Sequence, residues 1–326
     1  MRRISVLALS LSAMVTLSAC GGGGDPMDAP AKPSSPSSPS DMDGTGGDDA
    51  SATSAGDAAG GDPGSVIVAS ANFPENVLLA EIYAAALSDA GVDVTKKLNI
   101  GSRETYIAGL EDGSIDLIPE YTGGLATYLN PEITATSSED VLKDAQDNLP
   151  ADLQLLDISQ AEDKDSLVVT KETADKLGLA SIADLKDKAA DLVLGGPPEF
   201  ETRPNGVDGL KTIYGLDFKK FRSLAAGSNL TVQALKNGQV DVANIFTTDP
   251  AVGENGFVVL DDPESLFAAQ NIVPLITKDA VNPAVEEALN GVSAALDTDI
   301  LTQMMVKVVS DGQDPADVAR EFVDGM

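Results

Sequence analysis

The sequence contains no histidine, no tryptophan and a single cysteine among its 326 residues. These absences exclude Ser-His-Asp and Cys-His catalysis, histidine-ligated zinc, thiolate clusters and structural disulfides. Any enzyme would have to work with carboxylates, Lys, Ser or Tyr. We therefore expect no metal and no cofactor.

Basic residues are also scarce, with 21 Lys and Arg against 52 Asp and Glu, which gives a formal net charge of −31. Such a charge repels the phosphate backbone and excludes a nucleic-acid partner. Hydrophobic residues still make up 43% of the chain. That share is enough for an ordinary core, so the chain as a whole is not disordered.

The first twenty residues are typical of a secretory signal. Arg2 and Arg3 precede an apolar stretch that ends in Leu17-Ser18-Ala19-Cys20, which is similar to a bacterial lipobox. We predict a signal peptide over residues 1–19 and a lipid on Cys20 that anchors the protein to the extracytoplasmic face of the cell membrane. The alternative is an ordinary secretory signal followed by a buried cysteine.

The next segment has the composition of a linker. Gly, Pro and Ser occupy 24 of the 44 positions from 21 to 64. Segments of this kind cannot bury enough apolar surface to fold. We predict a lipidated, disordered tether over residues 20–64 and a folded module over residues 65–326.

Short β-branched runs alternate with longer amphipathic segments from Val66 onward. This alternation predicts an α/β fold with a largely parallel sheet flanked by helices. The expected strands are 66–69, 97–100, 115–118, 167–169, 192–194, 240–245, 258–260 and 272–276. The expected helices are 74–90, 103–111, 123–130, 138–148, 282–291, 297–309 and 315–323.

One pattern occurs twice. Leu110 to Leu117 and Leu235 to Val242 share the spacing L-x-x-G-x-(I/V)-D-(hydrophobic). In each copy the glycine suits a left-handed helix end, and the following residues enter a strand. Open α/β sheets bind ligands at such strand ends. The repeat predicts two lobes that share one cleft, and it assigns the aspartates Asp116 and Asp241 a structural hydrogen bond.

Several stretches resemble the substrate-binding lipoproteins of osmoprotectant ABC importers, the glycine betaine/choline/carnitine group of the OpuAC and ProX type. The most specific is Gly-x-Ile-Asp-Leu-Ile-Pro-Glu-Tyr-Thr-Gly from Gly113 to Gly123, and others are Ser70 to Glu75, Gly101 to Glu104, Val169 to Glu172 and Thr247 to Asp249. Together they cover residues 65–326 in order.

This resemblance implies a two-lobed periplasmic-binding-protein fold of type II, in which the chain crosses between the lobes. Lobe one would combine about 65–160 with 259–326, and lobe two would be about 161–258. The implied function is delivery of a small polar, osmoprotectant-like solute to the permease subunits of an ABC importer by a monomeric protein.

Relatives that bind quaternary ammonium ions surround the cation with tyrosine rings, which attract it through their quadrupoles. This sequence departs from that pattern, because the aligned positions hold Tyr121, Asp165, Phe246 and Gln270. We expect this incomplete cage to weaken binding of glycine betaine and choline and to favour a ligand with hydroxyl, amide or protonated amine groups.

The other candidate ligand-binding residues supply donors, acceptors and charge. Arg203 could clamp a carboxylate, and the helix start at Ser102 and Arg103 could bind one through its backbone. Ser102 could equally cap that helix, with Arg103 paired to Glu104 or Asp112, and Asn72 could cap the preceding one. The remaining candidates are Phe73, Thr122, Asp163, Thr247 and Asn271.

Two other classes of function remain open. A sensor or adhesion lipoprotein could use the same fold. An extracellular hydrolase would need paired carboxylates in a cleft, for which Glu120 and Asp163 could be nominated. The lack of tryptophan and the 4% aromatic content disfavour a glycan cleft, so we expect no enzymatic activity.

Overall fold

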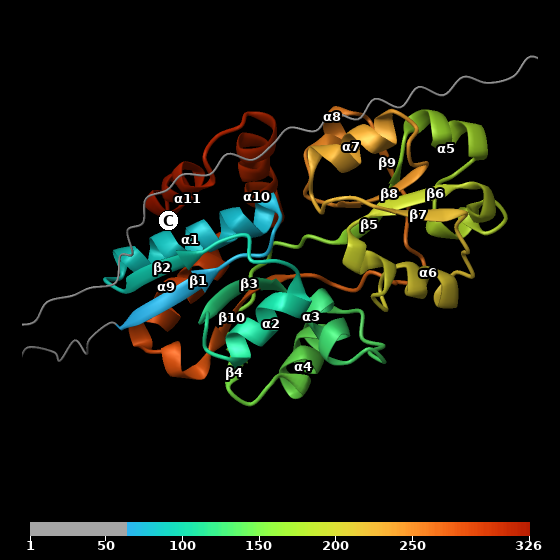
Figure 1. Ribbon diagram of the computed structural model, residues 1–326. Coiled ribbons are helices and arrows are strands. Elements are labelled where there is room, and N and C mark those ends of the chain that lie inside the picture. Colours follow the sequence, from blue (N-terminus) through green and yellow to red (C-terminus); the bar gives the residue numbers. More distant parts are fainter. Residues whose placement is uncertain (1–63) are drawn as a thin grey trace, which may run out of the picture. The chain divides into compact units, whose positions relative to one another are not determined.

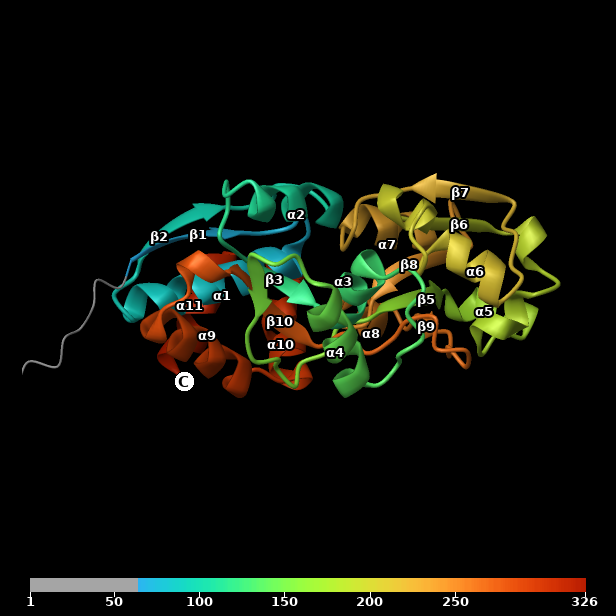
Figure 2. The same cartoon turned by 90° about the horizontal axis from the view of Figure 1, so that it is seen from below.

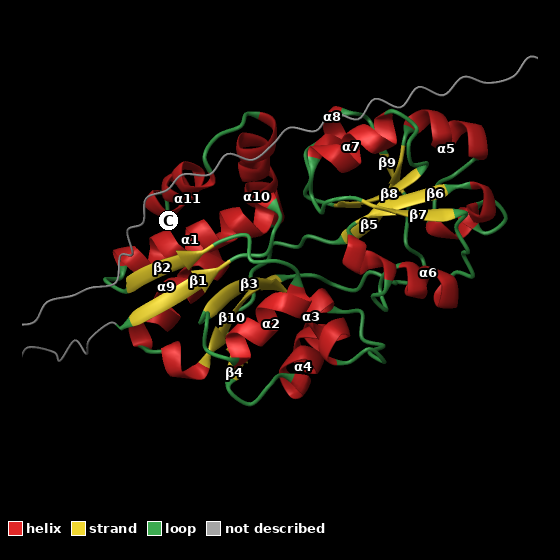
Figure 3. Cartoon of the chain, in the orientation of Figure 1, coloured by secondary structure: helices red, strands yellow, loops and turns green. Residues whose placement is uncertain are grey.

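A computed structural model describes residues 64–326, which belong to one compact unit. Cys20 and the other predictions for the signal peptide and tether fall outside the described residues. Figures 1 and 3 show two β-sheets, each with helices on both faces. The fold is therefore the predicted α/β class with two lobes.

The sheet of the first lobe has five strands in the order β2-β1-β3-β10-β4. β1 runs parallel to β2 and β3, whereas β10 is antiparallel to β3 and β4. Strand β10 therefore returns late in the chain to lie between two early strands. The strands are β1 (Ser65–Ala69), β2 (Asp93–Lys97), β3 (Leu117–Tyr121), β4 (Leu153–Leu155) and β10 (Ile272–Thr277).

Two apolar cores cover the faces of this sheet. One is built on a long, almost wholly buried helix, α1 (Pro74–Asp89), with α9 (Pro283–Ala295), α10 (Thr298–Met305) and α11 (Pro315–Asp324). The other packs α2 (Arg103–Glu111), α3 (Thr122–Leu129) and α4 (Ser138–Asn148) against the opposite face. The C-terminal helices thus complete the first lobe.

The second lobe repeats this plan with the strand order β7-β6-β8-β5-β9. Its strands are β5 (Asp165–Val169), β6 (Val193–Gly196), β7 (Lys220–Ser223), β8 (Val242–Phe246) and β9 (Val258–Val259). Its helices are α5 (Lys171–Leu177), α6 (Val207–Ile213), α7 (Asn229–Lys236) and α8 (Ala251–Glu254). Figure 2 shows the two lobes from below.

Two segments connect the lobes, between β4 and β5 and between β9 and β10. They pair with each other through a bridge between Glu162 and Asn271. Leu260, Leu266 and Phe267 pack in the core of the second lobe. This packing supports extending that lobe past residue 258 to about residue 267, with the crossover beginning after it.

The repeated helix-to-strand unit adopts the same geometry in both lobes. Gly113 and Gly238 have φ angles of 73° and 63°, the left-handed region expected for them. The Asp116 carboxylate accepts a 2.8 Å hydrogen bond from the backbone N–H of Ile67, and the Asp241 carboxylate accepts one of equal length from Val193. Each aspartate thus joins two neighbouring strands, which confirms the structural role predicted for both.

The sequence prediction placed the second strand wrongly, at 97–100 instead of 93–97. β2 is an edge strand that pairs only with β1, and most of its side chains are exposed. An edge strand with few buried positions has little of the hydrophobic alternation by which strands are recognised.

Candidate ligand-binding site

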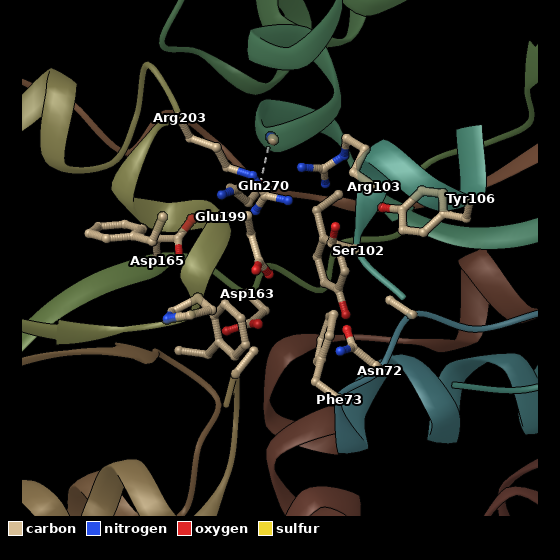
Figure 4. Close-up of a pocket in the computed structure, with 17 residues that line it drawn as sticks. Asn72, Phe73, Ser102, Arg103, Tyr106, Asp163, Asp165, Glu199, Arg203 and Gln270 are labelled. Atoms are coloured by element: carbon tan, nitrogen blue, oxygen red, sulfur yellow. Dashed lines mark hydrogen bonds between the residues drawn. The ribbon is translucent and has the colours of Figure 1, made fainter. Parts of the chain in front are cut away.

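A pocket lies where strands of both lobes end. Its first-lobe lining comes from the ends of β1 and β3, from α2 and from the start of α3, and its second-lobe lining comes from residues near β5, β6 and β8 (Figure 4). The crossover segments contribute Asp163 and Gln270. Residues of both lobes therefore face one cavity, as the repeat predicted.

Ten of the candidate residues line this cavity. They are Asn72, Phe73, Ser102, Arg103, Tyr121, Asp163, Asp165, Arg203, Phe246 and Gln270. The helix cap proposed for Asn72 falls instead on Phe73, which makes no side-chain capping bond. Ser102 likewise makes no cap bond and donates to Glu104 Oε2 at 2.5 Å.

Three candidates do not line the cavity, because neighbouring backbone and side chains hold their polar groups. The Thr122 hydroxyl donates to the Ala269 carbonyl and accepts the Asn271 N–H. The Asn271 amide bonds Ser138 and Ser159. The Thr247 hydroxyl bonds Asp163 and the Lys164 N–H. These three residues fasten the crossover rather than face the cavity.

Seven lining residues were missed by the sequence reasoning: Ala71, Tyr106, Gly124, Pro197, Glu199, Phe200 and Ala226. Two signals could have found some of them. Pro197 directly follows β6 and Glu199 lies two residues later, so the strand-end rule applies to them as well as to Tyr121. Tyr106 lies three residues after Arg103, on the same face of α2.

Aromatic rings gather at one part of the cavity. Phe73 has its ring centroid 5.2 Å from that of Phe246 and 6.0 Å from that of Tyr121. Tyr106 and Phe200 also line the cavity, which raises the aromatic side chains to five. Only two rings, Tyr121 and Phe246, stand at the cage positions of the relatives. Phe73 stands at none of these positions, yet its ring lies beside both of them.

Arg103 is held by a buried ion pair that the sequence did not suggest. Its Nε and Nη2 donate to the Oε1 and Oε2 of Glu120 at 2.7 and 2.8 Å. Tyr106 and the Tyr121 N–H also donate to this carboxylate, which is fully buried. Glu120 therefore positions Arg103 and does not line the cavity, so it cannot form a catalytic pair with Asp163.

A glycine pair lets Arg103 and the crossover approach α3. A Cβ on Gly124 would lie 2.7 Å from Arg103 Nη2, and one on Gly123 would lie 2.5 Å from the Ala269 carbonyl oxygen. Both distances are shorter than Cβ contacts allow. Close packing therefore requires glycine at both position 123 and position 124.

Arg203 reaches the cavity from the second lobe. It makes a forked contact across the cleft, with Nε and Nη2 at 3.1 and 3.2 Å from the carboxylate of Glu104 on α2. The hydrogen bonds and charge of Arg203 hold the pKa of Glu104 down at about 2, against the opposing effect of its partial burial. Glu104 therefore stays ionised throughout the neutral range.

Asp165 and Asp163 supply carboxyl groups to the cavity. Asp165 accepts hydrogen bonds from the amides of Asn244 and Asn205, while burial raises its pKa. Asp163 is 3% exposed and interacts with the buried Glu75 on α1. Burial first, and then the charge of Glu75, raises the pKa of Asp163 well above its ordinary value.

Two sheets joined by paired crossovers, with one polar and aromatic cavity between them, define a two-lobed solute-binding protein. Residues 64–325 match the family model described as the substrate binding domain of the ABC-type glycine betaine transport system, OpuAC. The chain belongs to this family, and it is a solute-binding protein rather than an enzyme.

Similar proteins agree with this assignment. A glycine-betaine-binding protein of Pseudomonas aeruginosa is 27% identical over 267 residues, covering 77% of this chain and 84% of the relative. The glycine betaine-binding protein YehZ of Escherichia coli is 26% identical over 266 residues, covering 76% and 86%. A solved glycine betaine/carnitine/choline ABC transporter structure shares the fold with a TM-score of 0.63 and 23% identity, covering 80% and 98%.

None of the helices in residues 64–326 is long and apolar enough to cross a membrane.

Proposed function

We propose that this protein binds a small zwitterionic, osmoprotectant-like solute outside the cytoplasm and delivers it to the permease subunits of an ABC importer. The observation that carries this proposal is the opposite chemistry of the two ends of the cavity. Arg103 and Arg203 approach each other at one end, and Asn72 and Phe73 lie at the other (Figure 4).

The arginine end suits a carboxylate. Glu120 engages Nε and Nη2 of Arg103, which leaves Nη1 as a further donor, and Arg203 adds a second guanidinium from the opposite lobe. Guanidinium groups bind carboxylates through parallel hydrogen bonds. A ligand carboxylate placed here would contact both lobes at once.

The aromatic end suits a cation. The faces of Phe73, Tyr121 and Phe246 can attract a positive charge, and Asp163 adds a carboxyl group from the crossover. Tyr121 keeps its proton, because burial and the neighbouring carboxyl groups raise its pKa. The names of the relatives, which include glycine-betaine-binding proteins, support the same ligand class.

Calorimetric titration with three related compounds tests this assignment. Glycine betaine carries both charges, choline keeps the cation without the carboxylate, and tert-butylacetate keeps the carboxylate without the cation. Because Phe73 adds a third ring to the cage that the sequence left incomplete, we replace the expectation of weak betaine binding. We now expect glycine betaine to bind at least tenfold more tightly than either of the other two compounds. Equal binding of all three, or no binding of glycine betaine, would contradict the proposal.

We further propose that Cys20 carries the lipid anchor and that residues 20–64 tether the binding module to the membrane. The lipobox-like Leu17-Ser18-Ala19-Cys20 and the glycine run after it support this. Replacing Cys20 with alanine should abolish incorporation of labelled palmitate and release the protein from the membrane fraction, whereas Thr45→Ala in the tether should change neither. Normal labelling of the Cys20→Ala variant would refute the anchor.

A further inference from the structure

Two carboxyl groups meet beneath the aromatic end of the cavity, and the mechanism of ligand contact described above uses only one of them. Glu75 lies on α1 of the first lobe and is 2% exposed, and Asp163 lies on the crossover and is 3% exposed. Thr248 donates to both of them, through its hydroxyl to Glu75 and through its N–H to Asp163, which brings the two carboxyl groups together. Two carboxyl groups placed in this way can hydrogen-bond to each other only when one of them carries a proton.

Their other partners come from both lobes. On the first-lobe side, the Tyr121 hydroxyl donates to Glu75 Oε1 at 3.0 Å. On the second-lobe side, the Thr248 hydroxyl donates to Glu75 Oε2, and the Thr248 N–H donates to Asp163 Oδ1 at 3.1 Å. The pair therefore forms part of the contact that holds the lobes together around the cavity.

No cation compensates these carboxyl groups within the part of the chain that the structure describes. None of the ion pairs in residues 64–326 includes Glu75 or Asp163. Asp249 after β8 is a further charged group that acts on Glu75 and adds repulsion, and the Tyr121 phenol on β3 is neutral. Two unpaired carboxylates in such surroundings cannot both stay ionised.

We propose that closing the two lobes takes up one proton, which Glu75 and Asp163 then share as a latch across the cleft. This rests on the proposed function, because it assumes that the lobes close around a ligand. When the lobes separate, water reaches both carboxyl groups and Thr248 leaves Glu75. Each carboxyl then ionises at neutral pH as an ordinary Asp or Glu does.

The direction of the pH effect follows from this linkage. The closed state binds one more proton than the open state, so closure is favoured at low pH and is weakened as the pH rises through the pKa of the closed pair. Above the ordinary carboxyl pKa of about 4 and below that of the closed pair, the dissociation constant of a ligand should rise about tenfold per pH unit.

Two measurements test the latch, one of them without any ligand. Small-angle X-ray scattering of the ligand-free protein should give a radius of gyration that increases between about pH 5 and pH 8. Calorimetric titration with glycine betaine as the probe, in buffers of different ionisation enthalpy, should show uptake of about one proton per ligand bound.

Two isosteric variants separate the latch from other contacts between the lobes. Glu75→Gln keeps an acceptor for Tyr121 but cannot share a proton, so it should remove both the pH dependence of the radius of gyration and the proton uptake. Asp163→Asn should have the same two effects and replaces Glu75→Gln if that variant folds poorly. Glu104→Gln removes the contact with Arg203 instead. Because Glu104 is ionised throughout this range, with a pKa of about 2, this control should weaken closure equally at every pH and keep the proton uptake.

A pH-independent radius of gyration in the unmodified protein would overturn the latch, as would an unchanged pH dependence in Glu75→Gln or Asp163→Asn. Failure of glycine betaine to bind at any pH would instead count against the proposed ligand class, while the scattering measurement would still decide the latch.

Discussion

Arg103 and Glu120 form a buried, two-pronged ion pair that joins the start of helix α2 to strand β3. The pair fixes the guanidinium group at one end of the cavity, and Tyr106 and the Tyr121 N–H complete the hydrogen bonds of the carboxylate. Burial and the charge of Glu120 act in opposite directions on Arg103, and the pKa of Arg103 is raised overall. The ion pair therefore links the stability of the first lobe to the shape of the ligand site.

Glu120→Gln should destabilise the protein strongly, because it leaves the buried charge of Arg103 without its counter-ion. Breaking a buried pair in this way costs about 3 kcal/mol or more, which corresponds to a melting temperature lower by roughly 6–12 °C. Asp147→Ala is the control, since its pair with Lys143 is exposed and its loss should change stability far less. Differential scanning calorimetry of both variants decides the matter; a similar small change in the two would mean that the buried pair is not needed.

Gly124→Ala should weaken ligand binding as well as stability. The added Cβ would lie 2.7 Å from Nη2 and 3.0 Å from Nη1 of Arg103, so the guanidinium group must leave its place beside Glu120. We expect at least a tenfold loss of affinity for glycine betaine in calorimetric titration. Gly253→Ala on α8 is the matched control, because nothing lies within 4 Å of its new Cβ, and its affinity should equal that of the unmodified protein.

Asp116→Ala and Asp241→Ala should have similar effects in the two lobes. Each substitution leaves a backbone N–H, of Ile67 or Val193, without its carboxylate acceptor between two strands. The loss of such a partner costs about 1–3 kcal/mol. Urea unfolding should show this cost for both variants and a much smaller change for Asp112→Ala, whose carboxylate bonds an exposed turn. A large effect in one lobe alone would contradict the equivalence of the two units.

These paired aspartates also show what the sequence could reveal. Their role was predictable because it depends on a short pattern that occurs twice, with the glycine, the strand and the carboxylate within a few residues of each other. The positions of Tyr121 and Phe246 at the cavity were predictable for the same reason, since each is the last residue of a strand of that pattern. Local signals thus gave the class of fold and the location of the site.

The contacts that decide the chemistry of the site are not local. The sequence offered Glu104 or Asp112 as partners of Arg103, because both lie close along α2, yet the partner is Glu120 on the neighbouring strand. In the same way, Glu75 reads as an ordinary first-turn residue of α1, and only the fold brings it against Asp163, 88 positions later (163 − 75). Partners at such separations are set by sheet order and lobe closure, which a single sequence does not specify.

Asp163→Asn should make the protein more stable than the unmodified form at alkaline pH and not at acidic pH. Burial raises the pKa of both Glu75 and Asp163 in the folded protein. A group whose folded pKa is raised contributes stability that is fully present below the unfolded pKa of about 4 and is lost as the pH rises through the folded pKa. The asparagine amide can donate to Glu75 at any pH and still accept from the Thr248 N–H, so the variant escapes that loss.

Melting temperatures should therefore agree near about pH 5 and diverge towards about pH 8, with the variant higher. Parallel pH profiles for the two proteins would show that the pair does not retain a proton in the folded state.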